Sequence, residues 1–262
     1  FKLHGTWTNS EIQKSNKNLK GEHVGAFLVF DTQENSEVLV KVSSSFINHA
    51  QASINLNREI PENISFEELV EEGKLVWNNE LSKIKVASQE SEKTNEDLIK
   101  FYSSLYRTIL FPRQFHEYDL DNNQIHYSPY DGNIYDGPLY TDNGFWDTFR
   151  AVFPFYSLVY PEKLGEIMQG IMVNPYLESG WLPEWSSPGH RDCMIGSNSA
   201  SIIAEAYLKG ITDFDIEKAY EGILNNSENE GPLSSVGRKG VEFYNNLGYI
   251  PVSYTHLTLP TK

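Results

Sequence analysis

The chain has 262 residues, with 21 Lys and Arg against 36 Asp and Glu, a formal charge of −15 and a single cysteine. This charge repels phosphate backbones and anionic lipid, and the sequence shows no basic patch that would override it, so no nucleic-acid partner is expected. One cysteine excludes a disulfide scaffold and a cysteine-based zinc site. No stretch approaches the ~20 apolar residues of a membrane-spanning helix, so no membrane insertion is expected.

Both ends of the sequence are expected to be cut. The chain starts at Phe1 without an initiator Met and enters structured-looking sequence at once, which favours a natural N-terminus further upstream. The last stretch, VSYTHLTLPTK, resembles the translation of a sequencing-library adapter, so residues 251–262 are predicted to be a non-native tail. An ordinary Thr-rich β-tail is the alternative.

The first predicted element is a β-hairpin between residues 24 and 42. The apolar run VGAFLVF is followed by the turn-forming DTQENS and then by EVLVKV, in which Val38, Val40 and Val42 alternate. Two strands alone are only marginally stable. The hairpin is therefore predicted to belong to a sheet that begins upstream.

Residues 43–93 turn helical and polar. Ser65 lies three positions before Glu68, as in a capping box, and an apolar stripe of Leu69, Val70, Trp77 and Leu81 follows. This segment is predicted to connect two domains and to pack against both.

From residue 94 onwards the pattern predicts one helix after another. Thr94 or Asn95 caps the first helix, which Pro112 ends. Residues 116–141 are predicted to form one long Tyr- and Asp-rich loop, and such loops are usually functional. Further helices are expected from Asn143, from Pro161 to Pro175, and at residues 198–209, 214–225 and 236–247. This succession indicates stacked helical hairpins in an array or toroid.

The segment GFWDTFR, residues 144–150, combines an aromatic and an acidic side chain in a way that suits sugar binding. A Trp ring such as that of Trp146 can cover the C–H face of a pyranose, and a carboxylate such as Asp147 can accept hydrogen bonds from two hydroxyls. The alternative is structural, with Asp147 capping the first turn of a helix and Trp146 in the core. On spacing alone the structural alternative is favoured.

A second segment rich in aromatic and polar residues spans residues 180–196 and lies between predicted helices, where binding residues are often found. Its aromatic and polar side chains include Trp181, Glu184, Trp185, His190, Arg191 and Asp192. Glu184 could act as an acid or a hydroxyl ligand, whereas Arg191 and Asp192 could equally form a structural ion pair. Cys193 is predicted to be a buried small hydrophobe, since no base accompanies it.

Two Asp-x-Asp pairs are assigned to local structure rather than to chemistry. Asp119 and Asp121 fit turn chemistry, and Asp213 and Asp215 fit helix capping. The sequence also lacks a phosphate-binding glycine loop, a His-Glu-x-x-His pair and a Gly-x-Ser-x-Gly elbow, which argues against nucleotide enzymes, zincins and α/β-hydrolases.

Three strings together resemble glycoside hydrolase family 92, a family of calcium-dependent exo-acting α-mannosidases. They are GFWDTFRAVFPFYSLVYPEKLGEIMQGIM, ESGWLPEWSSPGHRDCMIGSNSASIIAEAYLKGI and GRKGVEFYNNLGYIP. Each short motif alone is weak, but their order and spacing are specific. The resemblance runs from about residue 25 to residue 250.

The resemblance implies the end of an N-terminal β-sandwich followed by the first part of an incomplete (α/α)6 toroid. The expected domains are the sandwich end at 1–50, a helical linker at 51–93, the first part of the catalytic domain at 94–250 and the non-native tail at 251–262. Trp146 and Asp147 match the sugar-contacting Trp-Asp pair of the family. The remaining expected substrate-binding residues are Arg150, Glu184, Trp185, His190 and Arg191.

The resemblance also implies an inverting, α-1,2-mannosidase-like glycosidase that releases mannose from N-glycans or mannans, with Ca²⁺ holding sugar hydroxyls. The family places its general acid in an Asn-Glu-Pro motif and its base in an Asp-x-Asp element, and neither follows Asp215 here. We therefore expect no catalytic residue in this chain, calcium ligands mostly outside it, and an inactive fragment of an active parent enzyme. Secretion, or a periplasmic or cell-surface location, is expected from the substrate class. The alternatives are a non-catalytic carbohydrate-binding protein and another six-hairpin glycosidase.

Overall fold

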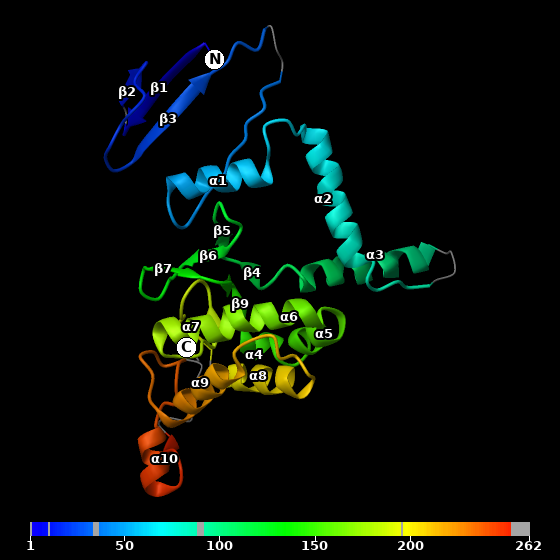
Figure 1. Cartoon of the computed structure of the whole chain (residues 1–262), viewed down its shortest axis with the longest axis vertical. Coiled ribbons are helices and arrows are strands. Elements are labelled where there is room, and N and C mark those ends of the chain that lie inside the picture. The colour runs from blue at the N-terminus through cyan, green and yellow to red at the C-terminus, as the bar shows by residue number, and fades with distance from the viewer. Residues whose placement is uncertain (1, 10, 34–36, 88–91, 195, 253–262) are drawn as a thin grey trace, which may run out of the picture. The chain divides into compact units, whose positions relative to one another are not determined.

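The fold is described from a computed structural model, which gives residues 2–9, 11–33, 37–87, 92–194 and 196–252 (Figure 1). The chain divides into two compact units, residues 1–42 and 43–262, and each is described by itself. One small antiparallel sheet comes first, three helices and several short strands follow, and most of the remaining chain is helical. No helix in the described ranges is long and apolar enough to cross a membrane.

The first unit is a three-stranded antiparallel sheet in the order β2-β1-β3. Its strands are β1 (Leu3–Thr8), β2 (Glu11–Lys14) and β3 (Val24–Val29). All six residues of β1 pair with β3, from Leu3 opposite Val29 to Thr8 opposite Val24. The indole of Trp7 covers Gly25 so closely that a Cβ there would lie 2.4 Å from the ring, so this position requires glycine.

The predicted pairing of two strands within residues 24–42 is wrong, whereas the prediction that the first of them belongs to a sheet that begins upstream is confirmed. The partner of β3 is β1, and the described residues 37–42 contain no strand. Val40 and Val42 are exposed there rather than buried on one face of a sheet. Alternation shows only that a segment could form a strand, whereas a strand also needs a neighbouring backbone to bond with.

The second unit begins with three helices: α1 (His49–Glu59), α2 (Phe66–Leu81) and α3 (Glu92–Thr108). The capping box predicted for Ser65 and Glu68 is confirmed, because the Ser65 hydroxyl accepts the Glu68 N–H while the Glu68 carboxylate accepts the Ser65 N–H. The predicted start of α3 at Thr94 or Asn95 is wrong, because the helix already begins at Glu92.

Residues 113–141 form short strands where one long irregular loop was predicted. The strands are β4 (Arg113–Gln114), β5 (Glu117–Tyr118), β6 (Gln124–Tyr127), β7 (Ile134–Asp136) and β8 (Tyr140–Thr141), paired as β4-β8 and β5-β6-β7. Buried His126 links this segment to a later helix. Its Nδ1 lies 2.9 Å from the Gly137 carbonyl within the segment, and its Nε2 lies 2.8 Å from an oxygen of Glu178, which belongs to the helix Asn174–Ser179. The predicted turn at Asp119 is confirmed, since its carboxylate accepts the Asn123 N–H at 2.7 Å.

The remaining helices enclose the main apolar core. They are α4 (Phe145–Thr148), α5 (Val152–Val159), α6 (Pro161–Met168), α7 (Asn174–Ser179), α8 (Asn198–Leu208), α9 (Ile216–Glu228) and α10 (Val241–Leu247). A π-turn, η1 (Gln169–Val173), joins α6 to α7. The core is built mainly from α5, α6, η1 and α8, with Phe153, Met168, Ile171 and Ile202 among its fully buried members.

Proline explains one prediction that is confirmed and one that is wrong. Pro161 opens α6, where a missing N–H costs nothing. Pro175 was predicted to end this helix, but the chain continues helically through η1 to Ser179. Pro175 is tolerated because it falls in the first turn of α7, directly after the π-turn. The last helix, α10, begins at Val241, five residues later than predicted.

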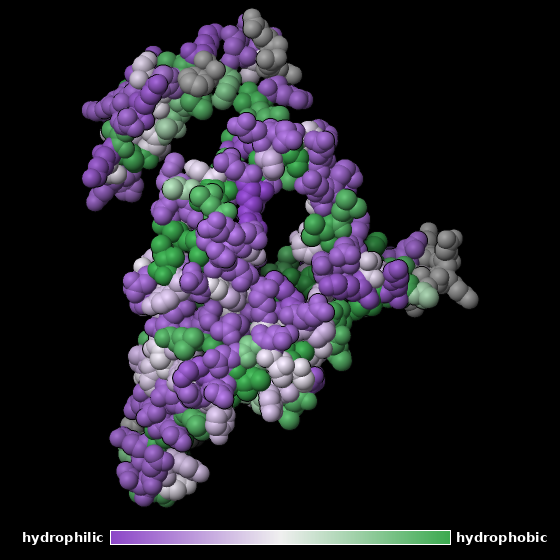
Figure 2. All heavy atoms as spheres, viewed as in Figure 1, coloured by the Kyte–Doolittle hydropathy of each residue, from purple (hydrophilic) through white to green (hydrophobic). Residues whose placement is uncertain are grey.

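Side chains on the surface are mixed in character. Figure 2 shows hydrophilic residues over most of the visible face, with hydrophobic residues between them. Several large apolar residues of the helical unit are exposed, namely Leu158, Leu177, Tyr207, Leu208 and Tyr220.

Candidate functional site

The predicted Trp-Asp pair lies on α4, a single helical turn that begins after β9 (Asn143–Gly144). Phe145 is completely buried and fixes this turn in the core, whereas Trp146 is 43% exposed and Asp147 is exposed beside it. The alternative with Trp146 in the core is therefore wrong. Asp147 forms no hydrogen bond or ion pair with another described residue, so its carboxylate is available to a ligand.

Arg150 fixes the ring of Trp146 from one side. Its guanidinium carbon lies 5.1 Å from the centroid of the Trp146 ring and 4.6 Å from that of Phe149. A guanidinium over an aromatic face is attractive and restricts the ring. This residue therefore restricts the indole from one side.

The second predicted segment, around residues 184–192, lies directly against the first. The strand β10 (Trp185–Ser186) pairs with β9, with Trp185 opposite Gly144 and Ser186 opposite Asn143. The Trp185 ring covers Gly144, where a Cβ would lie 2.4 Å from the ring. The pairing places Trp185 beside Gly144, the residue that precedes the turn carrying Trp146 and Asp147.

Glu184, by contrast, points into the protein. Its side chain is 2% exposed, and its carboxylate accepts the backbone N–H of Asn198 at 2.9 Å and the hydroxyl of Ser199 at 2.5 Å. Burial raises the pKa of this carboxyl to about 7, and the hydrogen bonds from Ser199 and Asn198 oppose that rise. Both carboxylate oxygens are therefore hydrogen-bonded to the first residues of α8 (Asn198–Leu208).

His190 is also mostly enclosed. Its Nε2 lies 3.0 Å from the Ser179 hydroxyl, and its ring meets Tyr130 edge-on with the centroids 4.8 Å apart. Burial lowers the pKa of His190 to about 4, so the ring is neutral near pH 7. The side chain is therefore a neutral, mostly buried group that packs against Tyr130.

Arg191 and Asp192 do not pair with each other in the described part of the chain. The Arg191 Nε donates to the Ser187 carbonyl at 2.7 Å, and Asp192 accepts the Ser234 hydroxyl at 2.6 Å. Arg191 is exposed next to the site. The prediction for Cys193 is wrong: the thiol is exposed, because the segment turns outward on the surface before α8 begins.

One residue of this region was missed from the sequence. Asp142 has a positive φ of 60° and accepts the Ser187 hydroxyl at 2.9 Å, and it forms an ion pair with Arg113. It thereby ties β4 to the loop after β10. The turn-prone string Asp-Asn-Gly before Phe145 was the signal that could have indicated it.

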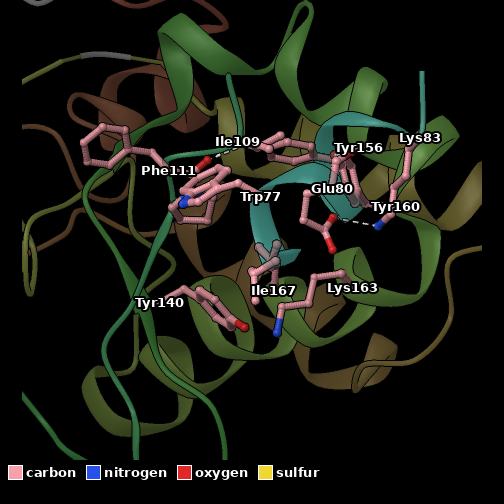
Figure 3. Close-up of a pocket in the computed structure, with 12 residues that line it drawn as sticks. Trp77, Glu80, Lys83, Ile109, Phe111, Tyr140, Tyr156, Tyr160, Lys163 and Ile167 are labelled. Atoms are coloured by element: carbon pink, nitrogen blue, oxygen red, sulfur yellow. Dashed lines mark hydrogen bonds and ion pairs between the residues drawn. The ribbon is translucent and has the colours of Figure 1, made fainter. Parts of the chain in front are cut away.

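A separate cavity of about 450 Å³ lies between α2, the end of α3 and the α5–α6 pair, and contains none of the predicted site residues (Figure 3). Trp77, Tyr140 and Tyr160 line it. Its charged groups are already paired, Glu80 with Lys83 at 2.8 Å and Lys163 with Glu166 at 3.0 Å. It therefore offers aromatic surface but few unpaired polar groups.

Within the described residues, no group of three or more His, Cys, Asp or Glu side chains could hold a metal ion. The described side chains therefore supply no calcium-binding cluster by themselves.

The comparisons with known proteins agree on one family. The model of the glycosyl hydrolase family 92 catalytic domain matches residues 51–259. A secreted, otherwise uncharacterized glycosidase of Arthroderma benhamiae is 29% identical over 234 residues, which cover 87% of this chain and 25% of that protein.

Two solved structures extend this result. An inverting mannosidase of family GH92 from Bacteroides thetaiotaomicron has 42% identity and a TM-score of 0.84, covering 96% of this chain and 33% of its own. An α-mannosidase of the same family and organism has 24% identity and a TM-score of 0.72, covering 95% of this chain and 33% of its own, and supports the fold alone. The chain thus spans between a quarter and a third of these relatives. It belongs to glycosyl hydrolase family 92.

Proposed function

We propose that this chain is part of an inverting exo-α-mannosidase that releases terminal mannose from N-glycans or mannans. The observation that carries the proposal is the outward-facing pair Trp146 and Asp147 on a turn whose first residue, Phe145, is fully buried. The 42% identity with an inverting mannosidase supports the reaction class. The protein is proposed to combine the end of a β-sandwich with the first part of an (α/α)6 toroid.

The exposed pair suits a pyranose. The free face of the Trp146 ring covers sugar C–H groups, while Asp147 accepts hydrogen bonds from two hydroxyls. Arg150 lies over the ring and holds it in one orientation. We assign Trp185, which lies opposite Gly144, together with His190 and the exposed Arg191, to the neighbouring part of the sugar site.

An inverting glycosidase uses two opposed carboxyl groups, one as acid and one as base, separated far enough to admit a water molecule. The family's Asn-Glu-Pro and Asp-x-Asp elements are absent after Asp215 in this sequence. We therefore assign substrate binding to this chain and place the acid, the base and the calcium ligands in other parts of the family domain. By itself the chain is expected to bind mannosides weakly and to cleave none.

Location outside the cytoplasm follows from the polymeric substrate and is supported by the secreted glycosidase among the relatives. A second candidate, a carbohydrate-binding protein without catalysis, rests on the same Trp146 and Asp147 surface. The two functions differ only in whether the sugar is cleaved.

The test compares the chain of residues 1–262 with a protein that contains it and has the length of its solved relatives. The longer protein should release mannose from an aryl α-mannoside, with NMR showing inverted anomeric configuration, and the shorter chain should not. Trp146→Ala and Asp147→Ala should each lower kcat/KM at least tenfold without changing Tm. Trp77→Ala is the matched control, since Trp77 is similarly exposed but lies in the separate cavity. Sugar binding without cleavage in the longer protein would favour the binding-protein alternative.

A further inference from the structure

The carboxylate of Glu184 stabilises the start of a helix that begins 14 residues later. The residue at the N-cap of α8, Ser197, makes no capping hydrogen bond with its side chain. Instead, the Glu184 carboxylate accepts the N–H groups of Asn198 at 2.9 Å and Ser199 at 3.3 Å, together with the Ser199 hydroxyl. A carboxylate at a helix N-terminus satisfies otherwise unpaired N–H groups and interacts favourably with the helix dipole.

The main chain of the same residue stabilises the start of α4. The Glu184 carbonyl accepts the N–H of Phe145 at 3.1 Å. Gly144, at the N-cap of α4, has no side chain that could do this. The next residue, Trp185, then pairs with Gly144 and covers it with its ring. The turn that carries Trp146 and Asp147 is thus held by the backbone of residues 184 and 185.

Both oxygens of the Glu184 side chain face hydrogen-bond donors, so each of them must act as an acceptor. Every described group within hydrogen-bond distance of it is a donor, since the Asn198 amide nitrogen at 3.4 Å joins the three donors named above. Above pH 7 the carboxyl is ionised and accepts all of them, whereas a Gln side chain would bring an NH₂ donor against them. Loss of the carboxylate would leave buried donors unpaired, and α8 packs directly against α4.

We propose that Glu184 is a positioning residue that fixes α8 and the first turn of α4 to one point, and so holds Trp146 and Asp147 in place for the sugar. Its side chain does not contact the substrate in this arrangement. The part that concerns the sugar rests on the proposed function, whereas the mechanical link between α8 and α4 does not.

Amide hydrogen exchange on the chain of residues 1–262 tests the link without any activity assay. In Glu184→Gln, exchange should accelerate at least tenfold both at Asn198–Ile202 and at Phe145–Thr148, while α6 stays unchanged. The matched control is Asp215→Ala, because Asp215 caps α9 through the Lys218 N–H but has no bond to α4. This control should accelerate exchange in α9 only.

Acceleration confined to Asn198–Ile202 in Glu184→Gln would overturn the proposal and leave Glu184 as a cap for α8 alone. If this variant does not fold, Ser199→Ala replaces it, since it removes one donor to the same carboxylate. A smaller acceleration, about twofold, is then expected at both segments. Again, a change at α8 alone would overturn the proposal.

The consequence for the sugar is measured in the longer protein. Glu184→Gln should lower kcat/KM on an aryl α-mannoside about tenfold, and Glu184→Asp, which keeps the charge, should recover part of the loss. An unchanged kcat/KM would overturn the positioning role. A wild-type protein without α-mannosidase activity would instead overturn the proposed function, and the exchange result would still decide the link between α8 and α4.

Discussion

Helices α8 and α9 pack against each other but begin in opposite ways. The cap of α9 is local: Asp215, at the N-cap, accepts the Lys218 N–H at 2.9 Å. The cap of α8 is remote, because it comes from Glu184 on the far side of an irregular loop. Asp215 is exposed, whereas Glu184 is buried. A local cap depends on four consecutive residues, and a remote cap depends on the whole arrangement around it.

The difference predicts unequal costs when each cap is removed. If the Asp215 side chain is removed, water can accept a hydrogen bond from the Lys218 N–H in its place, because the first turn of α9 is accessible there. Water cannot readily replace Glu184 in its buried position, so the donors of α8 would lose their partner. Four measurements test this comparison.

The largest effect is expected for Glu184→Ala. Removing a buried carboxylate that satisfies several donors should lower the free energy of unfolding by about 3 kcal/mol. Urea denaturation of the 1–262 chain measures it. Glu205→Ala is the control, since Glu205 lies on the same helix and pairs with Lys209 near the surface, where a loss within about 0.5 kcal/mol is expected. A loss below about 1 kcal/mol for Glu184→Ala would mean that the remote cap is no stronger than a local one.

The second effect is a dependence of stability on pH. Burial raises the pKa of Glu184 from 4.5 to about 7, so between these values the folded state holds a proton that the unfolded state has lost. The stabilisation that comes from binding this proton is fully present below pH 4.5 and disappears as the pH rises through about 7. The hydrogen bonds that the ionised carboxylate accepts are a separate contribution, which opposes the rise in pKa. The difference in stability between wild type and Glu184→Gln should therefore fall over this range.

His190 gives a dependence of the opposite sign. Burial lowers its pKa from 6.5 to about 4, so its contribution is present above pH 6.5 and is lost as the pH falls through about 4. Subtracting the Glu184→Gln curve removes this contribution, because both proteins contain His190. A difference curve that is flat between pH 4.5 and pH 7 would contradict the buried, raised carboxyl of Glu184.

The third effect is expected for Asp215→Ala. Loss of an exposed N-cap should cost about 1 kcal/mol, because one N–H at the start of α9 exchanges its carboxylate for water. The same urea titration measures the loss, and Asp215→Ser, which keeps a capping oxygen, should recover most of it. A cost as large as that of Glu184→Ala would remove the distinction between the two caps.

The smallest effect is expected for Ser65→Ala at the start of α2. This capping box is local and exposed, and α2 has no buried residue, so its first turn should lose only about 0.5 kcal/mol. Amide exchange at Phe66–Leu69 is the suitable measurement, since global unfolding responds weakly to such a change. Faster exchange beyond α2 would show that this helix is coupled to the core more tightly than its exposure indicates.

The features that could be predicted from the sequence act over a few neighbouring residues. The capping box at Ser65, the cap at Asp215, the turn at Asp119 and the helix start at Pro161 all need only local geometry, and all are confirmed. The family could also be recognised, because its motifs are read in order along the chain. The hairpin at residues 24–42 failed because the backbone partner of a strand is not a local property.

For the candidate site, the sequence by itself supplied the residue types, with Trp146 and Asp147 adjacent and Glu184 near Trp185. Only the tertiary structure decided that β9 pairs with β10, that Trp146 faces outward, and that Glu184 faces inward toward α8. The reason is physical: sequence patterns report the preferences of a residue and its near neighbours. The direction of a polar side chain depends on which donors the rest of the fold brings within hydrogen-bond distance.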